Sequence, residues 1–595
     1  MAQTFGAFTG QVTDSTGAAI SGASITVTNT ATNAVRNAVS NDAGLYDFPS
    51  LAPGVYHVKV EKPGFKSATS NNVQVQVQQT VRLDFSLTVG QVSESIEVLA
   101  SAAQLQTENS TVGTVIENKR IVELPLNGRN YLQLVSLSPN VTTASPSAGQ
   151  AGSRQGGDRA SQSIAVAGQR TMFNHFTLDG VENTDPNFNT YVILPSIDAI
   201  QEYKIQTGVY PAEFGREATQ INVLTRSGGN QFHGTAFEFL RNDKLDAKNY
   251  AFTTARPPKD PFKWNQYGFT FGGPVWIPKV FNGHDKLFFM GNYESFRQRR
   301  SVQSVYTVPT LAMQGGDFTA VANTIYDPAT RAKANGVVTA SAFPGQIIPK
   351  ARFDPISLKL LEFYPASNLT TSRLSNNFQE SQGRPINKDQ FVLRMDFVES
   401  DKSSWFGRYS WGDENQLSEG LHLDGTKILT NVEQYVGSNT RVLSPAVVTE
   451  TRFGYTRFYN SIGRNLAFTR NVVKELGIPG LNPGDPVVWG IPNVTLINYS
   501  SIGDDTEGPY ENKNNSLQFL NNTSWTHGKH TFRFGGEIRR EQFNQVGNQF
   551  ARGQWTFDLS ATQNPQTKTG GDSFAGFLLG QLSQAEAAVS IASAQ

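Results

Sequence analysis

Three segments that follow Gln104 decide the fold. They are LPLNGRNYLQLVSLSPNV (124–141), VAGQRTMFNHFTLDGV (166–181) and IQEYKIQTGVYPAEFGREATQINVLTRSGGNQFHGT (200–235). A strand pattern in the second segment ends at an Asp-Gly dipeptide, which signals a tight turn. In the third segment, apolar and polar residues alternate as they do in a half-buried strand. Short helical patterns lie between the strand patterns, so we expect an α+β domain over residues 111–230.

Together these segments resemble the plug domain of TonB-dependent outer-membrane transporters, followed by the first strand of the surrounding barrel. The resemblance implies a sheet that blocks the barrel lumen. One departure is visible: Ala218 and Thr219 stand where the family usually has paired glycines, a variant compatible with Oar-like members. The plug motif residues that the resemblance identifies are Asn127, Gly128, Arg129, Gly168, Arg170, Asp179, Gly180, Tyr210, Gly215 and Arg216.

Four charged residues of this region have two interpretations. Either they bridge the plug and the barrel wall, or they are solvated charges, whose exposed ion pairs contribute under about 1 kcal/mol. In a water-filled lumen weak bridges would be useful, because the plug must move while the barrel stays folded. These residues are Arg129, Arg170, Glu213 and Arg216.

Residues 91–110 are expected to be a linker that carries a coupling segment. Its core resembles a TonB box, a short extended stretch with a hydroxyl residue and alternating apolar side chains. Such a peptide can add as a strand to the sheet edge of a TonB-type energy-transducing partner. The alternative is a last strand of the preceding domain followed by a linker. The candidate partner-binding residues are Glu94, Ser95, Ile96, Glu97, Val98 and Leu99.

Residues 1–90 predict a small β-sandwich, because short alternating segments are separated by turn signals. Residues 55–60 alternate in this way, and Asp-Ser-Thr-Gly at 14–17 and Ala-Pro-Gly at 52–54 mark turns. The run from GQVTDSTGAAISGASITVTNT to NDAGLYDFPSLAPGVYHVKVEKPGF resembles the carboxypeptidase regulatory-like domain, a transthyretin-like sandwich of the carbohydrate-binding-like kind. His57 lies in an alternating strand, which favours a packed or exposed imidazole over a metal ligand.

Residues 231–595 predict the N-terminal part of a transmembrane antiparallel β-barrel with long extracellular loops. Apolar and polar residues alternate over segments such as 391–397, where Arg394 opposes Phe391 and Phe397, and this alternation is the barrel pattern. Two stretches rich in Pro, Gly and Asn, 307–387 and 460–511, are expected to be extracellular loops. Roughly ten to twelve strand-like segments are visible, whereas plugged outer-membrane transporters need about 22. We therefore expect an incomplete barrel and a longer parent protein.

Composition agrees with a mainly β protein and excludes several chemistries. Charged residues make up 17% and aromatic residues 11%, and the formal net charge is +0, which gives no reason to expect a nucleic-acid partner. The 595 residues contain no cysteine, so disulfides and thiol chemistry are excluded. No apolar run is long enough for a spanning helix. No secretion signal is visible, so an outer-membrane location requires that a signal peptide was removed or left out.

The resulting hypothesis is a TonB-dependent outer-membrane receptor of a Gram-negative-type bacterium, with its N-terminal domain in the periplasm. It would contact outer-membrane lipid and import a bulky extracellular ligand. One alternative is a structural, adhesion or export-related surface protein, and another is a soluble multi-sandwich carbohydrate-binding protein. No nucleotide-binding loop, hydrolase elbow or zinc-protease motif occurs, so no enzyme activity, cofactor or metal is expected. His527 and His530 fit a solvated turn better than a metal site.

Overall fold

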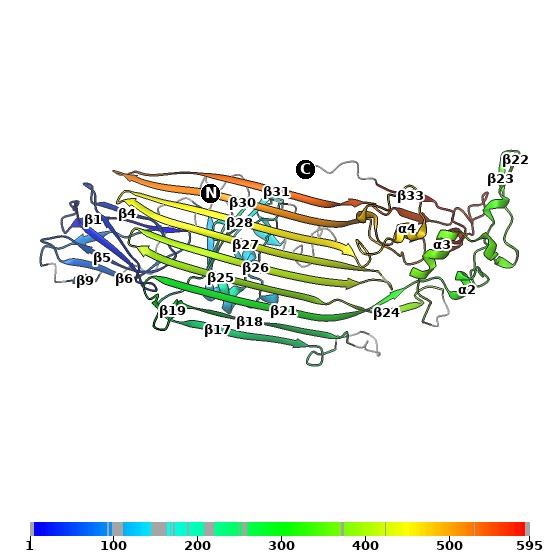
Figure 1. The fold of residues 1–595 in the computed structure, drawn as a ribbon, viewed down its shortest axis with the longest axis horizontal. Coiled ribbons are helices and arrows are strands. Elements are labelled where there is room, and N and C mark those ends of the chain that lie inside the picture. The colour runs from blue at the N-terminus through cyan, green and yellow to red at the C-terminus, as the bar shows by residue number, and fades with distance from the viewer. Residues whose placement is uncertain are drawn as a thin grey trace.

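Three regions follow one another along the long axis of the computed structural model: a small sandwich, a curved sheet around an inner domain, and a folded cap (Figure 1). The structure describes residues 5–91, 95–97, 111–143, 164–166, 168–170, 173–186, 190–207, 219–248, 250, 252, 259–369, 374–422, 424–528 and 530–588.

The N-terminal region is a β-sandwich, as predicted. One sheet has the order β4-β1-β7 with β8 also paired to β1, and the other has the order β3-β2-β5-β6-β9. The inward-facing residues Phe8, Ile25, Phe48 and Val58 are buried between the sheets. The strands are β1 (Gly6–Asp14), β2 (Ser24–Asn29), β3 (Val35–Val39), β4 (Leu45–Leu51), β5 (Gly54–Glu61), β6 (Ser67–Val75), β7 (Thr80–Arg82), β8 (Phe85–Leu87) and β9 (Ser95–Glu97).

The described residues of 111–225 form what we call the inner domain. Its five-stranded sheet has the order β10-β15-β16-β13-β14, and every residue of β16 is buried. Val432 and Phe458 of the surrounding sheet belong to its apolar core. Its elements are β10 (Gly113–Glu117), α1 (Asn118–Glu123), η1 (Asn127–Arg129), η2 (Tyr131–Leu137), β11 (Val141–Thr143), β12 (Ile164–Val166), β13 (Asn174–Leu178), β14 (Val181–Glu182), η6 (Ile197–Ala199), β15 (Ile200–Gln206) and β16 (Thr219–Thr225).

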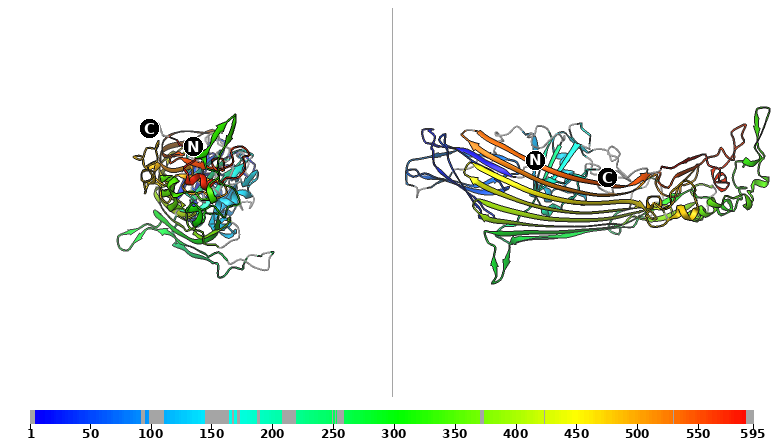
Figure 2. Two further views of the ribbon diagram at one scale, coloured as in Figure 1. Left: turned by 90° about the vertical axis from the view of Figure 1, so that its right-hand side faces the viewer. Right: turned by 45° about the horizontal axis from the view of Figure 1, so that its top comes forward.

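A ten-stranded antiparallel sheet curves around the inner domain (Figure 2). Its path is β17-β18-β21-β25-β26-β27-β28-β30-β31, with β24 paired to β21, and in the described part of the chain β17 and β31 are the ends of an open arc. A partial barrel was predicted and is confirmed. The strands are β17 (His233–Asn242), β18 (Phe262–Pro274), β21 (Leu287–Tyr306), β24 (Phe378–Gly383), β25 (Ile386–Ser400), β26 (Ser403–Glu419), β27 (Gly425–Ser444), β28 (Val447–Arg464), β30 (Glu507–His527) and β31 (His530–Gln549).

The two faces of this sheet differ in polarity. Phe269, Trp405 and Phe453 are exposed on the convex side, whereas Arg408 and Arg452 are buried on the concave side. Apolar residues outside and polar residues inside are typical of a wall between lipid and a lumen. Among the helices that the structure describes, none is long and apolar enough to cross a membrane.

Short turns join most of the strands at the end that carries the sandwich, and the two longest connections, 307–377 and 465–506, lie at the other end. Outer-membrane barrels have short periplasmic turns and longer extracellular loops, so the sandwich lies on the periplasmic side. Asn41 Nδ2 donates to the Gly528 carbonyl at 2.8 Å, and Asn33 Nδ2 donates to Asp285 Oδ1 at 2.9 Å. One periplasmic connection is longer and forms a hairpin of β19 (Trp276–Ile277) and β20 (Phe281–Asn282).

The two longest connections, 307–377 and 465–506, pack with the segment after β31, 550–588, and we call the described residues of these three segments the cap. Its apolar core joins Phe318, Val494 and Phe574 from all three segments. The expected loop 307–387 also contains β24 and the start of β25, and β28 and β30 extend into the expected loop 460–511. Cap elements are α2 (Leu311–Gln314), η8 (Pro328–Thr330), β22 (Ala332–Ala334), β23 (Val337–Thr339), η9 (Pro344–Gln346), η10 (Lys350–Arg352), α3 (Pro355–Leu360), η11 (Leu361–Phe363), α4 (Val472–Leu476), η12 (Pro486–Val488), β29 (Asn493–Leu496), β32 (Gln554–Phe557), α5 (Ser573–Leu578) and β33 (Gln584–Glu586).

Candidate functional site

The tight turn between β13 and β14 places a carboxylate against the wall. Asp179 and Gly180 both have positive φ, 49° and 73°, which a two-residue hairpin turn of this kind requires. The Asp179 carboxylate accepts hydrogen bonds from the Thr225 backbone N–H at 2.9 Å and from the Thr225 hydroxyl at 2.8 Å. These bonds fix the carboxylate at the end of β16.

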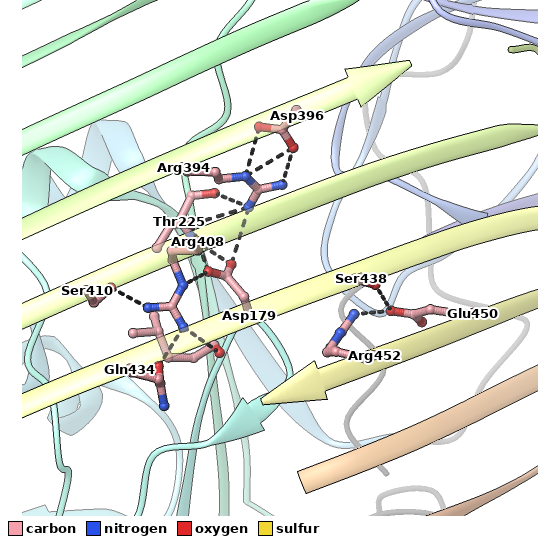
Figure 3. Close-up of polar contacts among 11 residues, drawn as sticks. Asp179, Thr225, Arg394, Asp396, Arg408, Ser410, Gln434, Ser438, Glu450 and Arg452 are labelled. Atoms are coloured by element: carbon pink, nitrogen blue, oxygen red, sulfur yellow. Dashed lines mark hydrogen bonds and ion pairs between the residues drawn. The ribbon is translucent and has the colours of Figure 1, made fainter. Parts of the chain in front are cut away.

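Two arginines of the wall meet this carboxylate (Figure 3). Arg408 Nε of β26 lies 2.7 Å from Asp179 Oδ2, and Arg394 Nη1 of β25 lies 3.4 Å from Oδ1. Arg408 also donates to the Gln434 side chain at 2.6 Å and to the Leu178 carbonyl at 3.3 Å. Burial alone would raise the pKa of Asp179, but the two guanidinium groups outweigh it and lower that pKa. A buried charge therefore links the inner domain to the wall.

The strand after the turn, β14, makes a second link to the wall. The carboxylate of Glu182 on β14 contacts His175 Nε2 at 2.8 Å and also pairs with Arg539 of β31. Its backbone N–H donates to the Gln518 side chain of β30 at 2.9 Å. Burial opposes ionisation of Glu182, yet the His175 and Arg539 charges hold its pKa at about 2.

The Val181 side chain also lies close to the backbone of the wall at Gly454. A Cβ atom added to Gly454 of β28 would lie 2.4 Å from Val181 Cγ1. Any side chain at this position would force the inner domain away from the wall, so glycine is required for the observed approach.

A third link involves the predicted motif residue Arg129. Its guanidinium pairs with Asp198 inside the domain, lies 3.5 Å from Glu294 of β21, and stacks 3.9 Å over the ring of Phe237. Ser196 Oγ donates to Glu294 at 2.5 Å. Arg129 therefore spans the inner domain and two wall strands.

A cavity of about 370 Å³ opens beside Arg129 toward the cap end of the lumen. Asn127 and Gly128 line it from the inner domain, and Trp264, Lys388 and Glu414 are among the wall residues that line it. Aromatic and charged groups of both signs face this space. It can therefore offer stacking and hydrogen bonds to a polar ligand.

The sandwich touches the inner domain through a cluster of titratable groups. The Val77 backbone N–H donates to the Glu202 carboxylate, Lys204 Nζ donates to the Gln78 carbonyl at 3.1 Å, and Gln76 Nε2 donates to Glu117 at 2.6 Å. Burial, and then the nearby charge of Glu117, raise the pKa of Glu202 to about 7. Burial lowers the pKa of Lys204 to about 8.

The structure describes only part of the predicted set. Arg170 and Gly168 are exposed, so Arg170 does not take part in the wall contacts described above. Ser95, Ile96 and Glu97 form β9, which pairs in parallel with Ser67–Thr69 of β6 at the sandwich edge. The predicted residues that lie outside the described ranges are Glu94, Val98, Leu99, Tyr210, Glu213, Gly215 and Arg216.

Several linking residues were not among the predicted site residues. Arg394 had been placed only on the polar face of a predicted strand, and Arg408 was not singled out. The signal that could have found them is an arginine on the inward face of a strand whose other face is apolar. Glu182 and Arg539 meet across more than half the chain, and no local pattern reports such a pairing.

Comparison with known proteins agrees with this architecture. Residues 224–595, more than half of the chain, match the family model for the outer membrane beta barrel domain. The chain belongs to this family. Residues 7–88 match the carboxypeptidase regulatory-like domain. As a member of the family it is an outer-membrane protein, and the predicted location is confirmed.

Among curated proteins, the TonB-dependent transporter Oar of Myxococcus xanthus is 26% identical over 294 residues, 47% of this chain and 26% of Oar. The predicted Oar-like relationship is thus confirmed. Among solved structures, the outer membrane transporter YddB from Escherichia coli has a TM-score of 0.43 at 8% identity, covering 76% of this chain and 51% of YddB. The siderophore receptor PirA from Acinetobacter baumannii has a TM-score of 0.34 at 13% identity, covering 76% and 60%. The chain spans about a quarter of Oar and about half of YddB.

Proposed function

We propose that this protein is a TonB-dependent receptor that imports a bulky nutrient by energy-coupled displacement of the inner domain, which acts as a plug. The observation that carries the proposal is the contact between Asp179 and the wall arginines Arg394 and Arg408. Such a contact is made of exchangeable polar groups, so water entering the lumen can replace it. A domain held this way can move while the wall keeps its strand pairing.

The coupling step would act on Ser95, Ile96 and Glu97. Because β9 already lies at a sheet edge, in parallel pairing with β6, its backbone is in the extended form that strand addition to a partner uses. A TonB-type protein would take β9 from β6 and pull along the chain toward the periplasm. The partner would thus compete with β6 for β9. Both interpretations of the segment then apply, because the last strand of the sandwich is also the strand that the partner binds.

The extracellular ligand would enter under the cap and reach the cavity beside Arg129. Trp264 and Phe296 offer aromatic faces there, and Lys388 and Glu414 offer charges of both signs. The candidate ligands to test are a ferric siderophore, cobalamin, an oligosaccharide and a peptide.

The test is deletion of residues 94–99 from the full-length protein in cells supplied with each labelled candidate. We expect loss of accumulation that depends on the proton gradient, with surface binding unchanged. Deletion of residues 101–106 is the matched control, because it shortens the same linker by the same length and spares the coupling segment. Unchanged accumulation after deletion of 94–99 would remove the coupling claim.

A second function is favoured by the cap, whose buried core of residues such as Phe318, Phe574 and Phe577 makes it a folded unit. A folded unit on the cell surface also suits adhesion or surface structure. In that case no candidate would accumulate under a proton gradient, and removal of the cap would abolish attachment of cells to surfaces.

A further inference from the structure

The hairpin between β18 and β21 is a formed structure at the periplasmic end of the wall. Trp276 pairs with Asn282, and Ile277 pairs with Phe281. The Val280 N–H closes the turn on the Ile277 carbonyl at 3.0 Å. Proline at position 278 and a φ of 64° at Lys279 fit a type II turn.

This hairpin exposes its large apolar side chains. The exposed fractions are 59% for Trp276, 49% for Ile277, 79% for Val280 and 38% for Phe281. Another turn at the same end, Asp401 and Lys402, is polar. Four neighbouring apolar side chains in water are unfavourable, and a contiguous apolar patch marks a binding surface.

The base of the hairpin is level with the outward aromatic residues of the wall. The Val275 N–H donates to the Leu287 carbonyl at 2.8 Å, Leu287 pairs with Phe397, and Phe397 pairs with Trp405. Trp405 faces outward with 49% exposure, and its Nε1 donates to Glu399 at 2.9 Å. Tryptophan with one apolar side and one polar contact is typical of the membrane interface.

The direction of the hairpin shows that it does not enter the lumen. It leaves the wall on the side away from the inner domain (Figure 2). Its base is also fixed to the periplasmic region, because Asp285 accepts hydrogen bonds from Asn33 at 2.9 Å and from Asn230 at 2.7 Å. The exposed Lys279 stands at the tip among the apolar residues.

We propose that residues 276–281 insert into the periplasmic leaflet of the outer membrane as an interfacial anchor. The side chains of Trp276, Ile277, Val280 and Phe281 enter the boundary between headgroups and acyl chains, and Lys279 reaches the phosphates of the phospholipids. Aromatic and aliphatic residues with a lysine at the rim are the chemistry of interfacial anchors. The continuity with the lipid-facing wall favours lipid as the occupant. Through Asp285, which accepts a hydrogen bond from Asn33, this anchor also lies next to the docked sandwich.

The test places a nitroxide label in the full-length protein within nanodiscs of phosphatidylethanolamine and phosphatidylglycerol. Val280→Cys carries the label at the tip, and Asp401→Cys carries it at the polar turn of the same end. We expect a several-fold higher ratio of oxygen to nickel-chelate collisions at position 280 than at position 401. Equal ratios, or a label at 280 shielded from both reagents by a protein partner or a second copy, would overturn the proposal.

A charge variant tests the phosphate contact separately. Lys279→Glu in the labelled Val280→Cys background sets a carboxylate against anionic headgroups, so the collision ratio at position 280 should fall. The fall should grow with the phosphatidylglycerol content of the nanodisc. A ratio that is unchanged by the substitution would contradict the contact with phosphates.

Discussion

The carboxylate of Asp179 is one of the groups that hold the turn of the inner domain to the wall. Two hydrogen bonds from Thr225 position it, and Arg408 and Arg394 neutralise it. Both the local turn signal and the resemblance pointed to Asp179 and Gly180, because an Asp-Gly turn has a local pattern. The arginines lie on distant strands, and their register against the turn depends on how the sheet curves. The sequence therefore predicts the turn but not its partners.

Replacing Asp179 with Asn should loosen the inner domain while the wall stays folded. The substitution leaves Arg408 without its buried counter-charge, while Arg394 keeps only Asp396, and the loss of a buried partner costs on the order of 3 to 5 kcal/mol. Urea unfolding of the full-length protein, followed by a label on the inner domain, measures the loss. Glu450→Gln is the matched control, since Glu450 is equally buried but contacts Ser438 and Arg452 of the wall (Figure 3). An equal loss in both variants would contradict a specific role for Asp179.

The pKa of Glu202 should make docking of the sandwich depend on pH. Undocking should expose Glu202, which contacts Val77 of the sandwich, and return its pKa from about 7 toward the ordinary value of 4.5. The docked state then binds more protons than the undocked state between these two values. Docking is then strongest at low pH and weakens as the pH rises through 7, by at most on the order of 3 kcal/mol. The lowered pKa of Lys204 acts above pH 8, outside this window.

Glu202→Gln should remove this pH dependence. Energy transfer between dyes on cysteines introduced at Ser15 and Asp401 reports docking of the full-length protein at pH 5, 6 and 7. Glu123→Gln, at an exposed position of α1, is the control and should keep the wild-type slope. A slope that survives in Glu202→Gln would assign the pH response to other groups.

At the scale of elements, the strands that face lipid on one side were the most predictable. Arg394 alternates with Leu393 and Met395 because one face of β25 meets lipid and the other meets the lumen. The cap was not predictable as a folded unit, since its core joins Phe318, Val494 and Phe574 from three separate segments. No periodic pattern of apolar residues relates these segments. Periodicity reports which face is buried, and it does not report which distant segments share a core.

The pairing of β9 with β6 predicts a reversible lock on the proposed coupling. Thr69 and Glu97 are directly opposite in the register, and opposite residues of paired strands lie close enough for a disulfide. Thr69→Cys with Glu97→Cys should stop gradient-dependent accumulation when oxidised and restore it when reduced, with ligand binding unchanged. The two single-cysteine variants are the controls. Accumulation by the oxidised double variant would show that β9 need not leave β6.

At the scale of the whole molecule, the sandwich, wall and cap lie in a row, and the contact between sandwich and wall is polar. Asn33 and Asn41 donate to Asp285 and to the Gly528 carbonyl, and Thr526 Oγ1 donates to Asp47 at 3.0 Å. Polar interfaces between domains allow relative motion. The sandwich can therefore undock as a unit, and motion of this kind would let a periplasmic partner reach β9.

Asn33→Asp together with Asn41→Asp should shift the sandwich toward the undocked state. Each change replaces an amide donor with a carboxylate, and at position 41 it keeps the side-chain oxygen that accepts the turn bonds of Ala43 and Leu45. Loss of two hydrogen bonds, each contributing about 0.5 to 1.5 kcal/mol, raises the undocked fraction roughly tenfold. The Ser15 and Asp401 dye pair measures this fraction, and the melting temperature of the wall should not change. Asn37→Asp adds one negative charge, against two in the double variant, at an exposed site within the sandwich, so a shift half as large there would attribute the effect to charge alone.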